Sequence, residues 1–124
     1  MTMDPSVRVA DGTGIAAQWV ANLMAPAAVL ATLQVCYMFV DRACPAGDML
    51  PVHLTALAGV ALSLLGAAIG WREWRRWGGV PAGEDGGAEG RSRFLAVTGL
   101  ANSTLAALVI AALWSATLFF HPCQ

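Results

Sequence analysis

The sequence PVHLTALAGVALSLLGAAIGW, residues 51–71, contains no aspartate, glutamate, lysine or arginine. A bilayer core about 30 Å thick is crossed by roughly 20 apolar residues in a helix. Residues 19–40 and 94–120 form two further apolar stretches, and neither of them carries a charge. Backbone polar groups at that depth must be satisfied within the segment, which favours a helix. The sequence therefore predicts an all-α integral membrane protein with three transmembrane helices.

The composition points to the same class. The chain has 124 residues, of which 57% are apolar and 12% are charged, whereas about a quarter of a soluble domain is charged. A net charge of −1 argues against a nucleic-acid partner held by a basic patch. Abundant alanine and glycine, with arginine and no lysine, are typical of a GC-rich bacterial genome. Residues 1–18 lack the basic start of a signal peptide, so we expect the first apolar stretch to be retained.

The arginines predict the orientation. Five arginines follow the second apolar stretch, whereas the segment between the first and second holds only Arg42. Basic residues near the ends of transmembrane helices favour the cytoplasmic side. We therefore expect residues 1–18 and 72–93 in the cytoplasm of a bacterium, and residues 41–50 and 121–124 in the periplasm. The chain would be a multi-pass protein of the inner membrane.

Tryptophans and arginines alternate where the second stretch leaves the membrane. Aromatic rings are favoured at the headgroup level, and arginine side chains reach toward the interface. This pattern predicts a set of interfacial anchors and lipid contacts: Trp71, Trp74, Trp77, Arg72, Arg75 and Arg76.

Small residues mark one face of the second helix. Gly59, Ser63, Gly66 and Gly70 are spaced by four, three and four residues, which places all of them on one side. Small residues let helix backbones approach closely in lipid, so this face is predicted to pack against other helices. The third helix has a weaker stripe of Gly99, Ser103, Ala107 and Ala111.

Two carboxamides, Gln34 and Asn102, lie within the apolar stretches. An amide facing hydrocarbon without a partner is costly. We expect both side chains to form hydrogen bonds, either across helices or to a partner subunit.

The cysteines divide into two groups. Cys44 and Cys123 are both expected on the oxidising side, where disulfides form, and a Cys44–Cys123 bridge is predicted. Cys36 lies within the first helix and is expected to act as a small apolar filler. The alternative is a copper or zinc site that uses both outer cysteines with His53 and His121, although no preorganising ligand spacing is present.

The chain resembles small three-helix membrane proteins found beside the subunits of bacterial haem-copper cytochrome c oxidases. The resemblance covers most of residues 19–124. It is carried by Gln34-Val35-Cys36-Tyr37, Cys44, His53, Trp71-Arg72, Arg93-Phe94-Leu95-Ala96 with Gly99, and Pro122-Cys123.

The resemblance implies a non-catalytic accessory subunit that packs against the large subunits of a respiratory complex. It implies no catalytic residue and no cofactor of the chain's own, because haem and copper would belong to the partner subunits. Two alternatives remain: an assembly factor handling copper or haem on the periplasmic side, and an electron-transfer component that binds quinone or haem.

Overall fold

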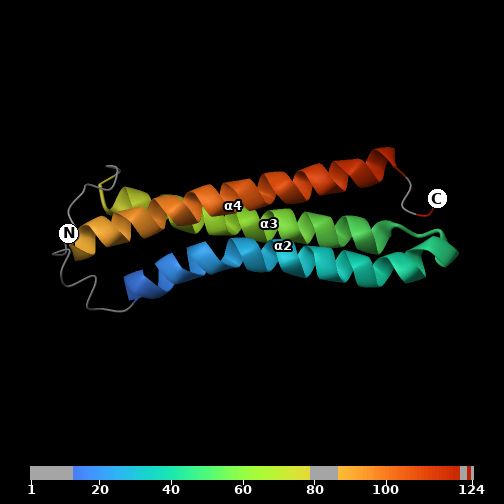
Figure 1. Cartoon of the computed structure of the whole chain (residues 1–124), viewed down its shortest axis with the longest axis horizontal. Helices are drawn as coiled ribbons and strands as arrows, with labels where there is room; N and C mark the ends of the chain where they lie inside the picture. The colour runs from blue at the N-terminus through green and yellow to red at the C-terminus, as the bar shows by residue number, and fades with distance from the viewer. Residues whose placement is uncertain (1–12, 79–86, 121–122, 124) are drawn as a thin grey trace.

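A computed structural model describes residues 13–78, 87–120 and 123 of the chain, without the side chains of residues 13–15, 88 and 89. Three long helices lie side by side in an elongated bundle (Figure 1): α2 (Thr13–Ala46), α3 (Leu50–Arg76) and α4 (Ala88–Phe119). The described residues contain no strand. Because α3 runs opposite to its two neighbours, α2 and α4 point the same way.

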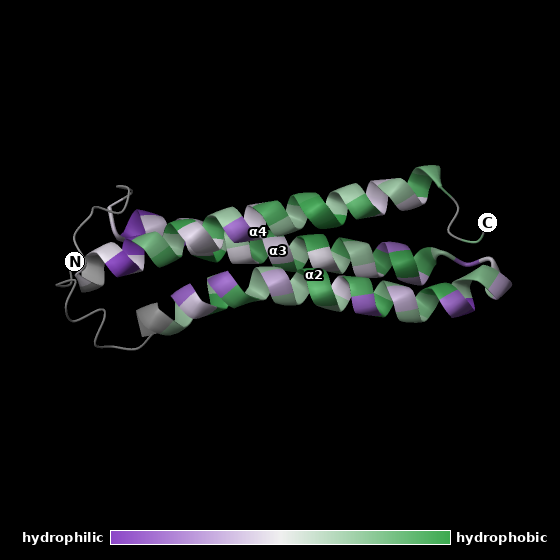
Figure 2. Cartoon of the chain, viewed as in Figure 1, coloured by the Kyte–Doolittle hydropathy of each residue, from purple (hydrophilic) through white to green (hydrophobic). Residues whose placement is uncertain are grey.

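All three helices are long and apolar enough to cross a membrane. Figure 2 shows that the most hydrophilic residues gather toward the ends of the bundle, while much of its length is apolar. Leucines and other large apolar side chains are exposed on all three helices, which suits a protein whose solvent is hydrocarbon. The predicted class, an all-α protein with three transmembrane helices, is confirmed.

The helices continue past the limits expected for the apolar stretches. Residues 41–46, which were expected in a loop, form the last turns of α2, and residues 72–76 extend α3. Helical hydrogen bonding does not have to stop where the hydrocarbon ends. Only Gly47, Asp48 and Met49 connect α2 to α3. Gly47 adopts a positive φ of 66°, which a glycine tolerates, and Asp48 accepts a hydrogen bond from the Leu50 amide at 3.0 Å.

The buried face of α3 repeats every seven residues. Seven residues are spaced alternately by four and three: Val52, Ala56, Gly59, Ser63, Gly66, Gly70 and Glu73. Trp77, which is 5% exposed, follows four residues later. This spacing is that of helices crossing at a shallow angle. All four predicted packing residues lie on this face.

The glycines of α3 allow contact at the level of the backbone. A Cβ atom on Gly70 would lie 2.8 Å from the Leu100 nitrogen of α4. A Cβ atom on Gly66 would lie 2.7 Å from the Ser103 hydroxyl, and one on Gly59 would collide with Thr32 of α2. No larger residue fits at Gly70 unless α4 moves away.

The packed stripe of α4 differs by one position from the prediction. Gly99, Ser103 and Ala107 are buried, but Ala111 is exposed and Ile110 takes its place. The expected stripe advanced by four residues each time, whereas the repeat alternates four and three. A strict spacing of four drifts around a helix of 3.6 residues per turn.

Candidate functional site

The two ends of the bundle differ, and we name them by their residues. The disulfide end holds the α2–α3 turn and Cys44, and the arginine end holds Arg72, Arg75 and Arg76 of α3. At the disulfide end, Cys44 in the last turn of α2 is bonded to Cys123, with the two Cα atoms 5.5 Å apart. The structure thus contains the predicted bridge, and Cys36 is free. The bridge ties the end of α2 to the chain that follows α4.

A second link lies on the same half of the bundle. The Trp114 indole of α4 donates a hydrogen bond of 2.8 Å to Nδ1 of His53 on α3. No sequence pattern predicts this pair, because the residues are 61 positions apart. Only the antiparallel arrangement of α3 and α4 places them at the same depth.

This hydrogen bond fixes the proton on the neutral His53 ring. Since Nδ1 accepts from Trp114, Nε2 carries the hydrogen. A histidine that ligates a metal through Nε2 has the opposite form, with Nδ1 donating to a neighbour. Cys44 and Cys123 are also bonded to each other rather than present as thiolates. Among the described residues no group of three potential ligands meets, and His121 lies outside them.

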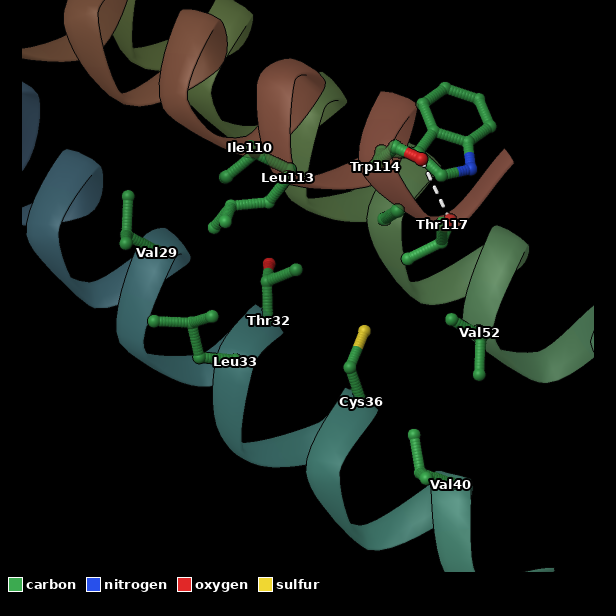
Figure 3. A pocket seen from close by; sticks show the side chains of 11 residues that line it. Val29, Thr32, Leu33, Cys36, Val40, Val52, Ile110, Leu113, Trp114 and Thr117 are labelled. Atoms are coloured by element: carbon green, nitrogen blue, oxygen red, sulfur yellow. Dashed lines mark hydrogen bonds between the residues drawn. The ribbon is translucent and has the colours of Figure 1, made fainter. Parts of the chain in front are cut away.

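A cavity of about 220 Å³ opens between the three helices toward the disulfide end. Its walls are almost entirely apolar and include Val29, Val52, Ile110 and Leu113. Figure 3 shows the Cys36 thiol and the Thr32 hydroxyl directed from α2 toward the other two helices. Cys36 thus borders a space that it does not fill, which modifies its predicted role as a filler.

Two further hydrogen bonds join α2 to α4 within the apolar part of the bundle. Asn22 of α2 donates to the Leu95 carbonyl of α4 at 2.9 Å. The Ser103 hydroxyl donates to the Ala21 carbonyl at 3.2 Å. Ala21 and Ser103 are both fully buried, and Asn22 directly follows Ala21. Ser103 belongs to the stripe predicted for the third helix, and its position next to a buried residue is the signal that would have selected Asn22.

Gln34 and Asn102, the two carboxamides named from the sequence, do not lie at these contacts between helices. Both side chains are exposed on the outside of the bundle, and within the described part of the chain neither makes a hydrogen bond. Among the described residues the expected bonds across helices are therefore absent, because both side chains point away from the packed faces. Bonds to a partner subunit remain a prediction.

A groove of about 400 Å³ lies beside one of these amides. It runs between α2 and α4 and is lined by Ala25, Pro26, Val29 and Leu30 on one side and by Asn102, Leu105, Ala106 and Val109 on the other. Asn102 supplies a carboxamide to an otherwise apolar wall.

The predicted anchors at the arginine end do not all face outward. Trp71 is 47% exposed, but Trp77 is buried, because the seven-residue repeat of α3 continues through it. The side chains of Arg72, Arg75 and Arg76 are exposed. The rings of Trp71 and Trp74 contact each other at a tilt of 57°, with their centroids 5.2 Å apart.

Glu73 is the charged residue on the packed face of α3. It is 3% exposed, and one of its carboxylate oxygens accepts a hydrogen bond from Arg76 at 3.2 Å. In the described part of the chain its other oxygen has no hydrogen-bond partner, and neither have the indole nitrogens of Trp74 and Trp77. The C-terminal end of α3 thus holds three buried polar atoms without partners among the described residues, and its role as an interfacial anchor stays a prediction.

Taken together, the three apolar helices define a multi-pass membrane protein that contacts lipid. Comparison with models of protein families, with curated proteins and with solved structures found no match to the chain. The resemblance to oxidase-associated proteins therefore stays a hypothesis that rests on the sequence.

Proposed function

We propose that the chain is a non-catalytic accessory subunit of a membrane complex, and that this complex is a bacterial terminal oxidase of the haem-copper type. The residues inside the bundle support the role of a non-catalytic accessory subunit. Along the packed faces, small residues bring the backbones together, and between residues 13 and 40, 50 and 71, and 94 and 119 no aspartate, glutamate, lysine or arginine occurs. Ion and proton pathways through membranes are usually marked by such residues.

The oxidase as the host complex is supported by the sequence resemblance alone. A tagged copy of the chain, purified in mild detergent from its own membranes, should bring down haem-containing subunits in a fixed ratio. Deleting the chain should lower the amount of assembled oxidase and leave turnover per haem nearly unchanged. An oxidase that assembles to its normal level but no longer pumps protons would contradict the proposal.

Orientation is part of the same proposal: the arginine end faces the cytoplasm and the disulfide end faces the periplasm. Two independent observations support it, the arginine excess after the second span and the Cys44–Cys123 bridge at the opposite end. Disulfides persist in oxidising compartments. A reporter that works only in the periplasm should be active when fused after residue 124, and one that works only in the cytoplasm should be inactive there. Activity of the cytoplasmic reporter would refute the orientation.

A further inference from the structure

We propose that the groove between α2 and α4 is the docking surface for a transmembrane helix of a partner protein. The docked helix carries polar side chains that form hydrogen bonds with Asn102 and Gln34. This inference rests on the proposed function as a subunit, and it adds the surface through which the chain joins its complex.

The exposed serine, threonine and carboxamide side chains of the spans fall into two groups. Hydroxyl groups on the outside of α4 turn back onto their own helix: Thr104 bonds the Leu100 carbonyl at 2.8 Å and Ser115 bonds the Ala112 carbonyl at 2.7 Å. The exposed carboxamides of Gln34 and Asn102 have no such bond within the described residues. Acyl chains supply neither donors nor acceptors, so these two amides need a polar partner.

One amide lies in the groove and the other lies one turn beyond its last lining residue on α2. Asn102 lines it directly, together with Pro26 and Leu30 of α2. Gln34 is one helical turn beyond Leu30 and therefore on the same side of α2. Pro26 adds a third feature, since its missing N–H leaves the Asn22 carbonyl without its usual helical donor.

The spacing of the amides selects a helix as the occupant. Asn102 is next to Ser103, which bonds Ala21, so Asn102 lies near the depth of Ala21. Gln34 is thirteen residues further along α2, which corresponds to about 20 Å. A lipid headgroup does not reach both depths, whereas a transmembrane helix passes both. Ala25 and Ala106 form the buried floor of the groove, and their small side chains leave room above them for a second helix.

The test uses the full chain in its own membranes. A photo-crosslinking amino acid replaces Leu30, which is 67% exposed at the groove. A control carries the same amino acid in place of Leu57, an exposed residue of α3. We expect a protein adduct from position 30, with the attachment mapped by mass spectrometry to a transmembrane segment of the partner, and no such adduct from position 57.

The proposal is decided by whether the yield of the adduct depends on the two amide side chains. Combining Gln34→Leu with Asn102→Leu should reduce the adduct about tenfold, as expected for the loss of two interhelical hydrogen bonds. Thr104→Val is the matched control, because it removes an exposed polar group that already bonds its own helix, and it should leave the yield unchanged. Leu105→Trp, which fills the groove and keeps both amides, should also abolish the adduct. A non-reducing gel checks that each variant retains the Cys44–Cys123 bridge.

The outcomes separate this inference from the proposed function. An adduct unaffected by the amide and groove variants overturns the docking surface, even where haem subunits still co-purify. An amide-dependent adduct with a membrane protein unrelated to an oxidase supports the docking surface and contradicts the oxidase assignment. An adduct between two copies of this chain overturns the partner proposed here.

Discussion

The two halves of the bundle are held together differently. In the half nearer the arginine end, Gly66 and Gly70 of α3 meet Ser103 and Leu100 of α4 at the level of the backbone. In the half nearer the disulfide end, bulkier residues keep the helices apart, and a cavity of about 220 Å³ lies between them. That half has a disulfide and the His53–Trp114 hydrogen bond. The closely packed half is joined by backbone contact and by hydrogen bonds from Asn22 and Ser103 to backbone carbonyls, whereas the looser half is joined by links between two side chains.

Gly70→Leu should lower the free energy of unfolding most, because it disrupts the tight half, which is the half nearer the arginine end. The new side chain would meet the backbone of Leu100, which cannot move away as a flexible side chain can. Overpacking of a core costs about 1–3 kcal/mol or more, and we expect the upper end of that range. The measurement is the free energy of unfolding of the purified protein in a detergent titration.

Ala68→Leu is the matched control, since Ala68 lies two residues away on the exposed side of α3. It should leave the unfolding free energy nearly unchanged. Equal destabilisation by both variants would show that the tight half does not depend on backbone contact.

Removing the disulfide should have the next largest effect, confined to the loose half. A bridge across a separation of 79 residues is worth about 4 kcal/mol in a soluble chain by the chain-entropy model. Inserted helices already restrict the unfolded state, so we expect about 2 kcal/mol from the combined Cys44→Ser and Cys123→Ser variant. Reductant should reproduce this loss in the wild-type protein and have no effect on the variant.

Counting thiols tests the bridge itself. Denatured, unreduced protein should expose one reactive cysteine, Cys36, and three after reduction. Three reactive thiols before reduction would show that the bridge is absent and would reopen the alternative of a metal site.

Trp114→Phe should lower the free energy of unfolding by a smaller amount. It keeps an aromatic ring beside His53 but removes the indole donor, and a typical hydrogen bond contributes about 1 kcal/mol. The unfolding titration should show a loss of that size. A loss no larger than that of Trp71→Phe, whose ring is half exposed at the other end, would mean that the hydrogen bond adds nothing to the loose half.

Filling the cavity should stabilise the loose half, whereas the preceding changes destabilise the bundle. Cys36→Leu places more hydrocarbon in the space that the thiol faces (Figure 3), and cavity-filling changes commonly stabilise by about 0.5–2 kcal/mol. We expect a gain of about 0.5 kcal/mol from the unfolding titration. Cys36→Ala enlarges the cavity and should shift stability the opposite way; a gain from both would contradict the role given to the cavity.

The sequence predicted the tight half better than the loose one. Its packing depends on residue size and spacing along one helix, so Gly66 and Gly70 could be assigned directly to one face, together with Ser63 and Gly59 further along α3. Their repeat also continues through Glu73 and Trp77. The sequence does not predict this continuation, because the predicted span ends at residue 71 and Trp77 is expected to be an interfacial anchor.

The features of the loose half depend on the arrangement of separate helices. His53 and Trp114 look like two unrelated interfacial residues until α3 and α4 are placed side by side. The same holds for the amides: Asn22 and Asn102 are chemically identical, and only the rotation of each helix decides which one bonds Leu95 and which one faces outward. The disulfide was predictable because the shared compartment, rather than the packing, brings Cys44 and Cys123 together.

The bridge also has a consequence for how the protein is made. Cys44 is synthesised before α3 and α4, and its partner Cys123 follows α4. The bond therefore forms only after the last helix has been inserted and both thiols have reached the same oxidising compartment. A chain inserted upside down would expose both thiols to the reducing cytoplasm and keep them reduced. The oxidised fraction on a non-reducing gel is thus a direct count of chains that completed insertion in the proposed orientation.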